Sequence, residues 1–179
     1  MKLYLIRHAQ AESNVKRIVN DSLKTKIHIT SLGKNQAQFA GKKLANKKIE
    51  IIFSSQFPRC QETSKIVNRF LKVKIIKDKR LNEWASGFDG KSYDELNEYL
   101  KTDPFILKHK KGESIPKLKK RIISFINDLK NNKKQEYNSV LIVSHEQVLK
   151  MLIGYLKNLD DKKAMKIKIP NAKILSFEI

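Results

Sequence analysis

Cysteine is almost absent from this sequence, since Cys60 is the only one among 179 residues. A disulfide within the chain is therefore excluded, which is consistent with a reducing compartment. The sequence also has no apolar run near the ~20 residues that a membrane-spanning helix requires. The N-terminal segment MKLYLI has neither the long apolar stretch nor the small-residue cleavage site of a signal peptide. We therefore expect a cytoplasmic protein with no membrane partner.

Acidic residues are scarce: 18 Asp and Glu stand against 38 Lys and Arg, a formal charge of +20. A positive field of this size attracts phosphates and nucleic acids. The lysines are spread along the whole chain, however, and the sequence has no zinc-finger pattern, glycine-rich phosphate loop or RNA-binding aromatic motif. We interpret the excess as compositional, and nucleic acid is not expected as a partner. No cysteine or carboxylate cluster has metal-ligand spacing, so no metal and no other cofactor are expected.

Four short apolar runs predict buried strands, at residues 2–6, 50–53, 73–77 and 139–143. Between them, apolar residues recur at helical spacing. These stripes are Ala37, Ala40, Gly41 and Leu44; Ile66, Val67, Phe70 and Leu71; and Leu118, Ile122, Phe125, Ile126 and Leu129. A capping box at Ser92 and Glu95 predicts a further helix that turns Leu96, Tyr99 and Leu100 inward, and another is predicted at 146–157. Alternating strands and helices favour an α/β sandwich around a largely parallel sheet, as one domain over residues 1–179.

The C-terminal part has a different pattern. Residues 165–169 (MKIKI) and 175–179 (LSFEI) both alternate between apolar and polar residues, with a turn at Pro170 and Asn171. We expect two short strands near a sheet edge, and such an edge permits a homodimer. Residues 101–116 are the least regular stretch and are predicted to form a loop beside the site.

Five polar groups follow the ends of the predicted strands. Arg7 and His8 follow the first, Arg59 the second, Glu83 the third, and His145 the fourth. In open parallel sheets, ligands bind outside the carboxyl ends of the strands.

This set of residues suits phosphoryl chemistry. Guanidinium forks bind phosphate oxygens, a histidine nitrogen can attack phosphorus, and a second, protonated histidine stabilises the developing charge. A glutamate can protonate the departing oxygen and then deprotonate the attacking water.

Several segments resemble the histidine phosphatase superfamily, the phosphoglycerate-mutase-like group. They are LIRHAQAESN, ITSLGKNQAQFAGKKL, FSSQFPRCQETS, the acid loop LNEWASGFDG, GES at 112–114, and IVSHEQVLKMLIGYL. The resemblance implies a three-layer αβα sandwich around a mostly parallel sheet with an antiparallel edge strand. It also implies that His8 is the phosphorylated nucleophile and Glu83 the proton donor. By the same resemblance Arg7, Arg59 and His145 complete the phosphate pocket, and Asn14 lines the substrate site.

Four residues depart from the family pattern. Ala9 stands where a glycine follows the first histidine, and it would be strained there if the position needs a positive φ angle. Gln56 replaces a proline, Cys60 replaces an alanine, and Glu146 replaces the glycine after the second histidine. A carboxylate at 146 would repel dianions or recognise a cationic part of the substrate.

Some assignments stay open at this point. Asp89, Glu62 or Glu113 could be the acid in place of Glu83. Trp84 could shape the pocket or fill the core, and Cys60 is interpreted as a small packed residue.

The other two histidines are interpreted differently from His8 and His145. His28 is expected to be a packed or surface residue, and His109 a solvated loop residue.

The leading hypothesis is a metal-independent phosphatase that hydrolyses phosphomonoesters of small molecules through a phosphohistidine intermediate. A phosphorylated protein is a second class of substrate. The close alternative is a phosphoglycerate mutase, which returns the phosphoryl group to another hydroxyl. The distant alternative is a polyanion or nucleic-acid binder on a retired phosphatase fold, whose binding would weaken with salt and survive His8→Ala.

Overall fold

The computed structural model describes residues 1–101, 112–131 and 137–179. Its centre is a five-stranded sheet with the order β3-β2-β4-β1-β5. The strands are β1 (Lys2–Arg7), β2 (Ile51–Ser54), β3 (Lys74–Lys77), β4 (Ser139–Ser144) and β5 (Ile174–Glu178). The first four are parallel to their neighbours, and β5 runs antiparallel to β1 at the edge. The predicted sheet, including its antiparallel edge strand, is confirmed.

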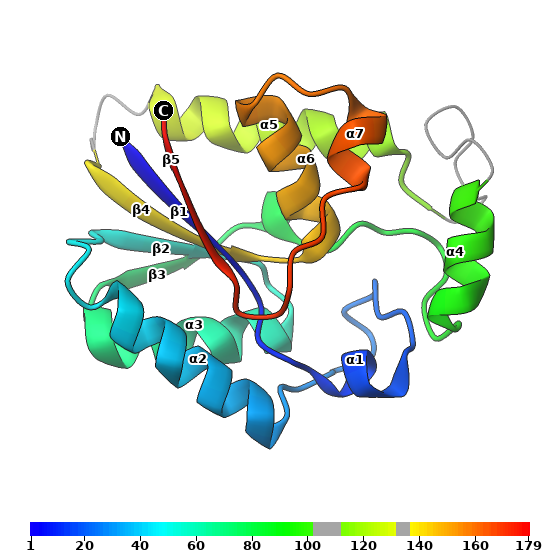
Figure 1. Cartoon of the computed structure of the whole chain (residues 1–179), viewed down its shortest axis with the longest axis horizontal. Coiled ribbons are helices and arrows are strands. Elements are labelled where there is room, and N and C mark those ends of the chain that lie inside the picture. Colours follow the sequence, from blue (N-terminus) through cyan, green and yellow to red (C-terminus); the bar gives the residue numbers. More distant parts are fainter. Residues whose placement is uncertain (102–111, 132–136) are drawn as a thin grey trace.

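Helices cover both faces of the sheet, as Figure 1 shows. The helices of the described residues are α1 (Glu12–Lys16), α2 (Ser31–Leu44), α3 (Pro58–Leu71), α4 (Tyr93–Lys101), α5 (Ile115–Lys130), α6 (Glu146–Leu156) and α7 (Asp161–Met165), with a 3-10 turn, η1 (Lys79–Leu81). Helices α2 and α3 pack together on one face, and α5, α6 and α7 lie on the other. This is the three-layer αβα sandwich that the resemblance implies.

The pleat of β1 decides which residues enter which layer. Leu3 and Leu5 pack into the core cluster under α5 and α6, whereas Tyr4 and Ile6 pack into the cluster under α2 and α3. Because both faces are covered, the strand is a continuous apolar run, and each fully buried leucine contributes about 2 kcal/mol. The core therefore holds β1 rigidly, and with it Arg7 at the end of the strand and His8 directly after it.

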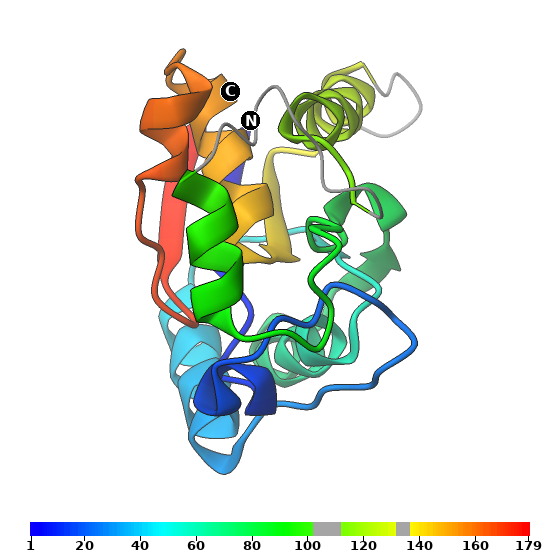
Figure 2. The ribbon, with the colours of Figure 1, turned by 90° about the vertical axis from the view of Figure 1, so that its right-hand side faces the viewer.

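Helix α4 stands apart from the sheet, on the side where the parallel strands end (Figures 1 and 2). The predicted capping box at its start is confirmed, because Glu95 N donates to Ser92 Oγ and Ser92 N donates to the Glu95 carboxylate. None of its residues is fully buried. Leu96 and Leu100 are half-buried and face the cavity described below.

The prediction of a strand at 165–169 is wrong. Asp160 caps the start of α7 by accepting from Lys163 N, so residues 161–165 form a helix and Met165 belongs to its last turn. From Lys166 to Pro170 the chain forms no strand. The alternation of apolar and polar residues still corresponds to alternating burial, since Ile169 is buried and Lys168 is exposed. Burial alone produced this pattern, and no strand pairing accompanies it.

The predicted loop at 101–116 falls mostly outside the described residues. Lys101 ends α4, and Ile115 and Pro116 already belong to α5, where Ser114 is the N-cap.

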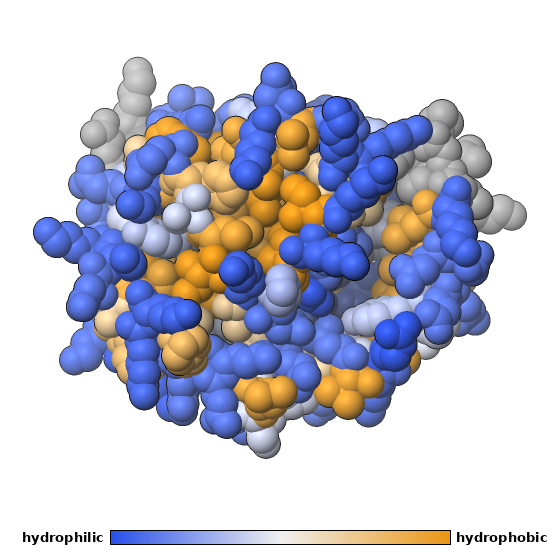
Figure 3. Space-filling view, viewed as in Figure 1, coloured by the Kyte–Doolittle hydropathy of each residue, from blue (hydrophilic) through white to orange (hydrophobic). Residues whose placement is uncertain are grey.

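The edge strand β5 carries the half-buried residues Ile174, Leu175 and Phe177. Figure 3 shows hydrophobic residues gathered over β5 and the segment before it, with hydrophilic side chains around them. The homodimer stays a prediction.

Candidate active site

His8 lies directly after β1, where its backbone N–H donates to Ser144 O at 2.9 Å. Its side chain is 3% exposed. Nδ1 lies 2.8 Å from the carbonyl of Ala9, so this nitrogen carries the proton and donates it to that oxygen. Nε2 therefore has the lone pair, and Arg59 Nε donates to it at 3.3 Å. Burial, together with Arg59 and Arg7, lowers the pKa of His8 well below its usual value, which leaves a neutral imidazole.

The loop after His8 is held by the two helices of the layer beneath it. Ala9 N donates to Thr63 Oγ1 of α3 at 3.0 Å, and Gln10 N donates to Gln36 Oε1 of α2 at 2.9 Å. A Cβ on Gly33 would lie 2.2 Å from Gln10 O, so α2 can approach the loop only because residue 33 is glycine. Ala9 is not among the residues with positive φ, so alanine is unstrained there.

Arg59 is the most enclosed cation of the site, at 2% exposure. Pro58 begins α3 immediately before it, at the carboxyl end of β2. Asn20 accepts from both terminal nitrogens of Arg59, through Oδ1 from Nη1 and through its backbone carbonyl from Nη2 at 2.9 Å. Arg59 Nη2 also lies 3.1 Å from His145 Nδ1. Asn20 thus turns the guanidinium toward both histidines.

His145 follows β4 and is completely buried. Its ring lies edge-on to that of His8, with centroids 5.3 Å apart. Nε2 lies 2.8 Å from Ser55 Oγ. Burial, followed by the charge of Arg59, lowers the pKa of His145 well below its usual value. We expected a protonated ring, and the structure instead favours a neutral one.

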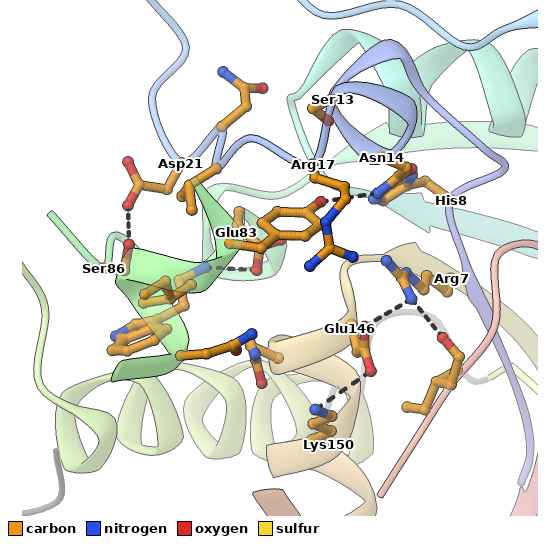
Figure 4. Close-up of a pocket in the computed structure, with 18 of the residues that line it drawn as sticks. Arg7, His8, Ser13, Asn14, Arg17, Asp21, Glu83, Ser86, Glu146 and Lys150 are labelled. Atoms are coloured by element: carbon orange, nitrogen blue, oxygen red, sulfur yellow. Dashed lines mark hydrogen bonds and ion pairs between the residues drawn. The ribbon is translucent and has the colours of Figure 1, made fainter. Parts of the chain in front are cut away.

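Arg7, the last residue of β1, is held by two acceptors. Its Nη1 lies 2.7 Å from Glu146 Oε2 and donates to the carbonyl of Ile169 at 2.7 Å (Figure 4). Lys150 lies 3.3 Å from the other oxygen of Glu146, so this carboxylate bridges two cations of the chain. Arg7 Nε is buried and has no hydrogen-bond partner within the described residues.

Glu83 lies in the acid loop, residues 81–90, and its carboxylate faces His145 and Arg59. Its Oε2 lies 3.5 Å from His145 Nδ1 and 3.8 Å from Arg59 Nη2, and its side chain is 19% exposed. Trp84 N donates to the other oxygen at 3.0 Å. Burial is the largest influence on the Glu83 carboxyl, and it raises the pKa above the usual value despite the nearby arginines.

The three other carboxylates considered for the acid have different partners. Glu113 pairs with Arg121 at 2.8 Å, Glu62 accepts from Ile29 N at 2.9 Å, and Asp89 accepts from Asp21 N at 3.0 Å. None of the three lines the cavity described below. Glu83 is therefore the sequence-predicted acid that the fold brings to the histidines.

Asn14 lies on α1, which the sequence did not predict. Its Oδ1 accepts from Ala11 N at 2.9 Å, and its Nδ2 donates to Tyr93 Oη at 3.1 Å. The residue lines the cavity and links α1 to α4.

A cavity of about 610 Å³ opens between α1, α4 and the start of α6 (Figure 4). Its lining includes Arg7, His8, Asn14, Arg59 and Glu83, together with Val19, Asn20, Asp21, Tyr93, Leu96, Leu100, Glu146, Gln147, Lys150 and Lys168. His145 lies behind this lining, against Arg59.

Two polar atoms of this lining are buried without a hydrogen-bond partner among the described residues, the donor Arg7 Nε and the acceptor Gln147 Oε1. Buried polar atoms are rarely left unpaired, so both atoms are available to bind a ligand in the cavity.

Sequence reasoning missed Asn20, Ser55 and Gln147. Ser55 and Gln147 lie within segments that carry the family resemblance, and only their contacts distinguish them from neighbouring residues. Asn20 lies in an irregular segment without a motif, so no sequence signal identifies it.

Four further residues were considered individually in the sequence: His28, Cys60, Trp84 and His109. His28 is an exposed residue that pairs with Glu62, and Cys60 is fully buried. Trp84 packs in the core and also lines the cavity, with its indole N–H donating to Glu113 O at 2.7 Å. His109 lies outside the described residues.

Among residues 1–101, 112–131 and 137–179, no group of three or more His, Cys, Asp or Glu side chains is placed to hold a metal ion. In the same part of the chain, no helix is both long and apolar enough to cross a bilayer.

Residues 3–179 match the histidine phosphatase superfamily (branch 1). The chain therefore belongs to this superfamily of enzymes, as its motifs suggested.

Two curated relatives differ in the reaction that their names give. "Putative phosphoserine phosphatase 2" of Hydrogenobacter thermophilus is 32% identical, over 99% of this chain and 89% of that protein. A 2,3-bisphosphoglycerate-dependent phosphoglycerate mutase of Thermoplasma acidophilum is 24% identical, over 98% of this chain and 86% of that protein.

Among solved structures, YhfR of Bacillus stearothermophilus superposes with a TM-score of 0.88 at 25% identity. The match covers 99% of this chain and 91% of that one. The layers and the sheet described above are thus those of the superfamily.

Proposed function

We propose that this chain, acting as one domain over residues 1–179, hydrolyses phosphomonoesters through a phosphohistidine on His8, without a metal ion. The observation that carries the proposal is the state of the His8 ring. Its proton is held on Nδ1 by Ala9 O, and its unprotonated Nε2 accepts from Arg59 Nε at the floor of a cavity. A neutral imidazole nitrogen beside fixed positive charge is a nucleophile directed at an anionic electrophile.

The phosphate lies between Arg7 and Arg59 in this proposal. Arg7 Nε, which has no hydrogen-bond partner among the described residues, donates to one phosphate oxygen, and Arg59 supplies the opposite side. The incoming dianion raises the pKa of His145, because an opposite charge favours the protonated ring. His145 can then donate from Nδ1 to a third oxygen, where charge develops in the transition state.

In the first step, the lone pair of His8 Nε2 forms a bond to phosphorus as the bond to the leaving oxygen breaks. Glu83 enters this step as the carboxylic acid and transfers its proton to that oxygen, so that the alcohol departs neutral. The raised pKa of Glu83 keeps a larger fraction of this group protonated than in an exposed glutamate.

In the second step, a water oxygen attacks the phosphorus of phosphohistidine. The Glu83 carboxylate accepts a proton from this water, and the phosphorus–nitrogen bond breaks. The electron pair of that bond returns to His8 Nε2, which restores the starting protonation states of both residues.

The outer part of the cavity receives the leaving group. Leu96 and Leu100 form an apolar wall, Lys168 is exposed at the rim, and Gln147 Oε1 requires a hydrogen-bond donor. Phosphoserine, the substrate in the name of one relative, supplies an ammonium donor and a carboxylate. We infer that small phosphorylated metabolites of this kind are the substrates, in the cytoplasm.

The phosphoglycerate mutase activity named for the other relative is the alternative. Both reactions share the phosphohistidine step and differ in the acceptor, which is water in one and a second hydroxyl in the other. With 3-phosphoglycerate, release of inorganic phosphate supports hydrolysis, and formation of 2-phosphoglycerate supports the mutase.

The test of the proposal is to trap the intermediate. The enzyme is mixed with a ³²P-labelled phosphomonoester and quenched in alkali, and peptide mapping locates the label. We expect alkali-stable, acid-labile label on His8, and neither label nor turnover in His8→Ala. Label that survives acid would indicate a phosphoester on another residue and contradict the proposal.

A further inference from the structure

A chain of side chains connects His145 to the start of the acid loop. His145 Nε2 lies 2.8 Å from Ser55 Oγ, and Ser55 Oγ lies 3.2 Å from Asn82 Oδ1. Asn82 is the residue immediately before Glu83. Ser55 is fully buried, so each of its hydrogen bonds must be satisfied within the protein.

The direction of these hydrogen bonds follows from a backbone donor. Gln56 N donates to Asn82 Oδ1 at 2.9 Å, which fixes the oxygen side of the Asn82 amide toward residues 55 and 56. Asn82 Nδ2 donates to Gln56 Oε1 at 2.9 Å and holds the amide in the same orientation. Because Asn82 Oδ1 can only accept, the proton between it and Ser55 belongs to the serine hydroxyl.

The Ser55 hydroxyl has one proton to donate and two lone pairs that accept hydrogen bonds. Its proton goes to Asn82, and one lone pair accepts from Phe57 N at 3.3 Å. Its second lone pair can accept from His145 Nε2 at 2.8 Å, and the Cys60 thiol lies 3.4 Å from the same nitrogen. Because Ser55 Oγ is the closer and stronger acceptor, we assign a proton to Nε2, which donates it to the serine. His145 Nδ1 is consequently unprotonated, which agrees with Arg59 Nη2 at 3.1 Å on that side.

The backbone N–H of Gln56 fixes the orientation of the Asn82 amide. The superfamily motif resembled by this segment has proline at the position, and proline has no backbone N–H. The hydrogen bond from residue 56 to Asn82 Oδ1 can therefore form only because this chain departs from that pattern.

We propose that Ser55 and Asn82 are positioning residues that hold His145 in its Nε2–H tautomer. They keep an acceptor on Nε2, so that Nδ1 is the nitrogen that faces the reacting phosphate and takes up the second proton. The kinetic part of this inference rests on the proposed function, whereas the tautomer does not.

The surroundings of His145 otherwise oppose a second proton. The charged or titratable groups that face the ring are Arg7 and His8 after β1, Arg59 and Cys60 on α3, Glu83 in the acid loop, and Arg121 on α5. Only Glu83 can carry a charge that favours the imidazolium, and it does so only as the carboxylate, not as the acid of the first step. A hydrogen bond from Nε2–H to the uncharged acceptor Ser55 Oγ therefore helps to stabilise the protonated ring.

The tautomer is tested by ¹⁵N NMR of the full-length protein labelled at histidine, with His145→Gln used to assign the signals. We expect a protonated Nε2 and an unprotonated Nδ1 in the wild type. Ser55→Ala and Asn82→Leu should lose this preference, and Asn82→Asp should keep it because the acceptor remains. A wild-type ring protonated on Nδ1 would overturn the proposal.

A matched pair at residue 56 isolates the backbone donor. Gln56→Pro removes the N–H, which frees Asn82 to turn its Nδ2 toward Ser55 and reverse the chain of donors. Gln56→Ala loses the side chain but keeps the N–H. We expect a mixed or reversed tautomer in the proline variant only, and the same tautomer in both variants would count against the inference.

The kinetic readout is the pH dependence of kcat. Loss of the acceptor in Ser55→Ala or Asn82→Leu should lower kcat/KM about tenfold or more. With p-nitrophenyl phosphate, whose leaving group needs no proton from Glu83, it should also move the alkaline limb of the kcat profile to lower pH, because the imidazolium of His145 is destabilised. Asn82→Asp places a negative charge in the chain and should move that limb to higher pH.

A merely structural role would not give shifts of opposite sign, and unshifted profiles in all three variants would overturn the inference. A wild type without phosphatase activity would refute the proposed function and leave the NMR result standing.

Discussion

Arg7 and Glu146 form an ion pair in the lining of the cavity, with 2.7 Å between Arg7 Nη1 and Glu146 Oε2. The carbonyl of Ile169 accepts from the same nitrogen. One end of the guanidinium is thus held by the protein, while Nε has no partner in the part of the chain that the structure describes. Glu146, which the sequence suggested would contact substrate, instead holds a residue that does so in the proposed reaction.

Two substitutions separate the charge of Glu146 from its hydrogen bond. Glu146→Gln keeps an oxygen for Arg7 but removes a negative charge, so product phosphate should inhibit severalfold more strongly. Glu146→Ala also releases Arg7, and we expect kcat/KM to fall about tenfold below that of the glutamine variant. Steady-state kinetics with phosphate inhibition measure both effects. Identical kcat/KM values for the two variants would mean that Glu146 does not position Arg7.

Replacing Glu83 should slow the reaction in proportion to how much the leaving group needs a proton. Glu83→Gln should reduce phosphoryl-enzyme formation from an alkyl phosphate by ~10²–10⁴-fold, and far less from p-nitrophenyl phosphate, which releases a stable phenolate. Breakdown of the intermediate still lacks its base, so a burst of nitrophenolate should appear. Single-turnover and pre-steady-state rates measure this. Equal slowing for both substrates without a burst would show that Glu83 only shapes the pocket.

The pH dependence of kcat/KM should be displaced toward acid. The reactive free enzyme has His8 neutral and Glu83 protonated. Because the pKa of His8 is lowered, activity should persist below pH 6.5, where an ordinary histidine becomes protonated. Because the pKa of Glu83 is raised from 4.5, activity toward alkyl phosphates should fall only as the pH passes that higher value.

The control for this profile is Glu83→Gln, which cannot ionise at residue 83 and should lack the alkaline limb in its residual turnover of the same alkyl phosphate. An alkaline limb at the same pH in the variant would assign it to another group.

Cys60 should be unreactive in the folded protein. The thiol is fully buried, and burial raises its pKa to about 12, so almost no thiolate exists near neutral pH. Iodoacetamide at pH 8 should label Cys60 in urea and leave the native protein unmodified, as mass spectrometry can measure. Rapid labelling without denaturant would show that the layer between α3 and the sheet opens readily.

Activity should not depend on added metal. The positive charge that binds phosphate comes from Arg7, Arg59 and His145 in the proposed reaction, so turnover should persist in EDTA. Vanadate should inhibit at low concentration, because its trigonal-bipyramidal form resembles the transition state. Loss of turnover on chelation that magnesium restores would contradict this mechanism.

The sequence by itself determined the layers and the end of the sheet at which the site lies. Its apolar runs gave the four parallel strands to within one or two residues, because strands covered on both faces need continuous hydrophobic side chains. The polar residues directly after those strands, such as His8 and His145, were brought together because parallel strands end at one edge of the sheet. The capping box at Ser92 could also be predicted from the sequence, since its hydrogen bonds join residues only three positions apart.

The tertiary structure alone decided the partners of each polar group. Alternation at 165–169 reports which side chains are buried, but a strand also needs a neighbour for its backbone, and Ile169 O is used by Arg7 instead. The orientation of Arg59 depends on Asn20, and the tautomer of His145 on Ser55 and Asn82, residues distant in sequence. Hydrogen bonds of this kind act over about 3 Å, so only the folded chain could determine which nitrogen faces the substrate.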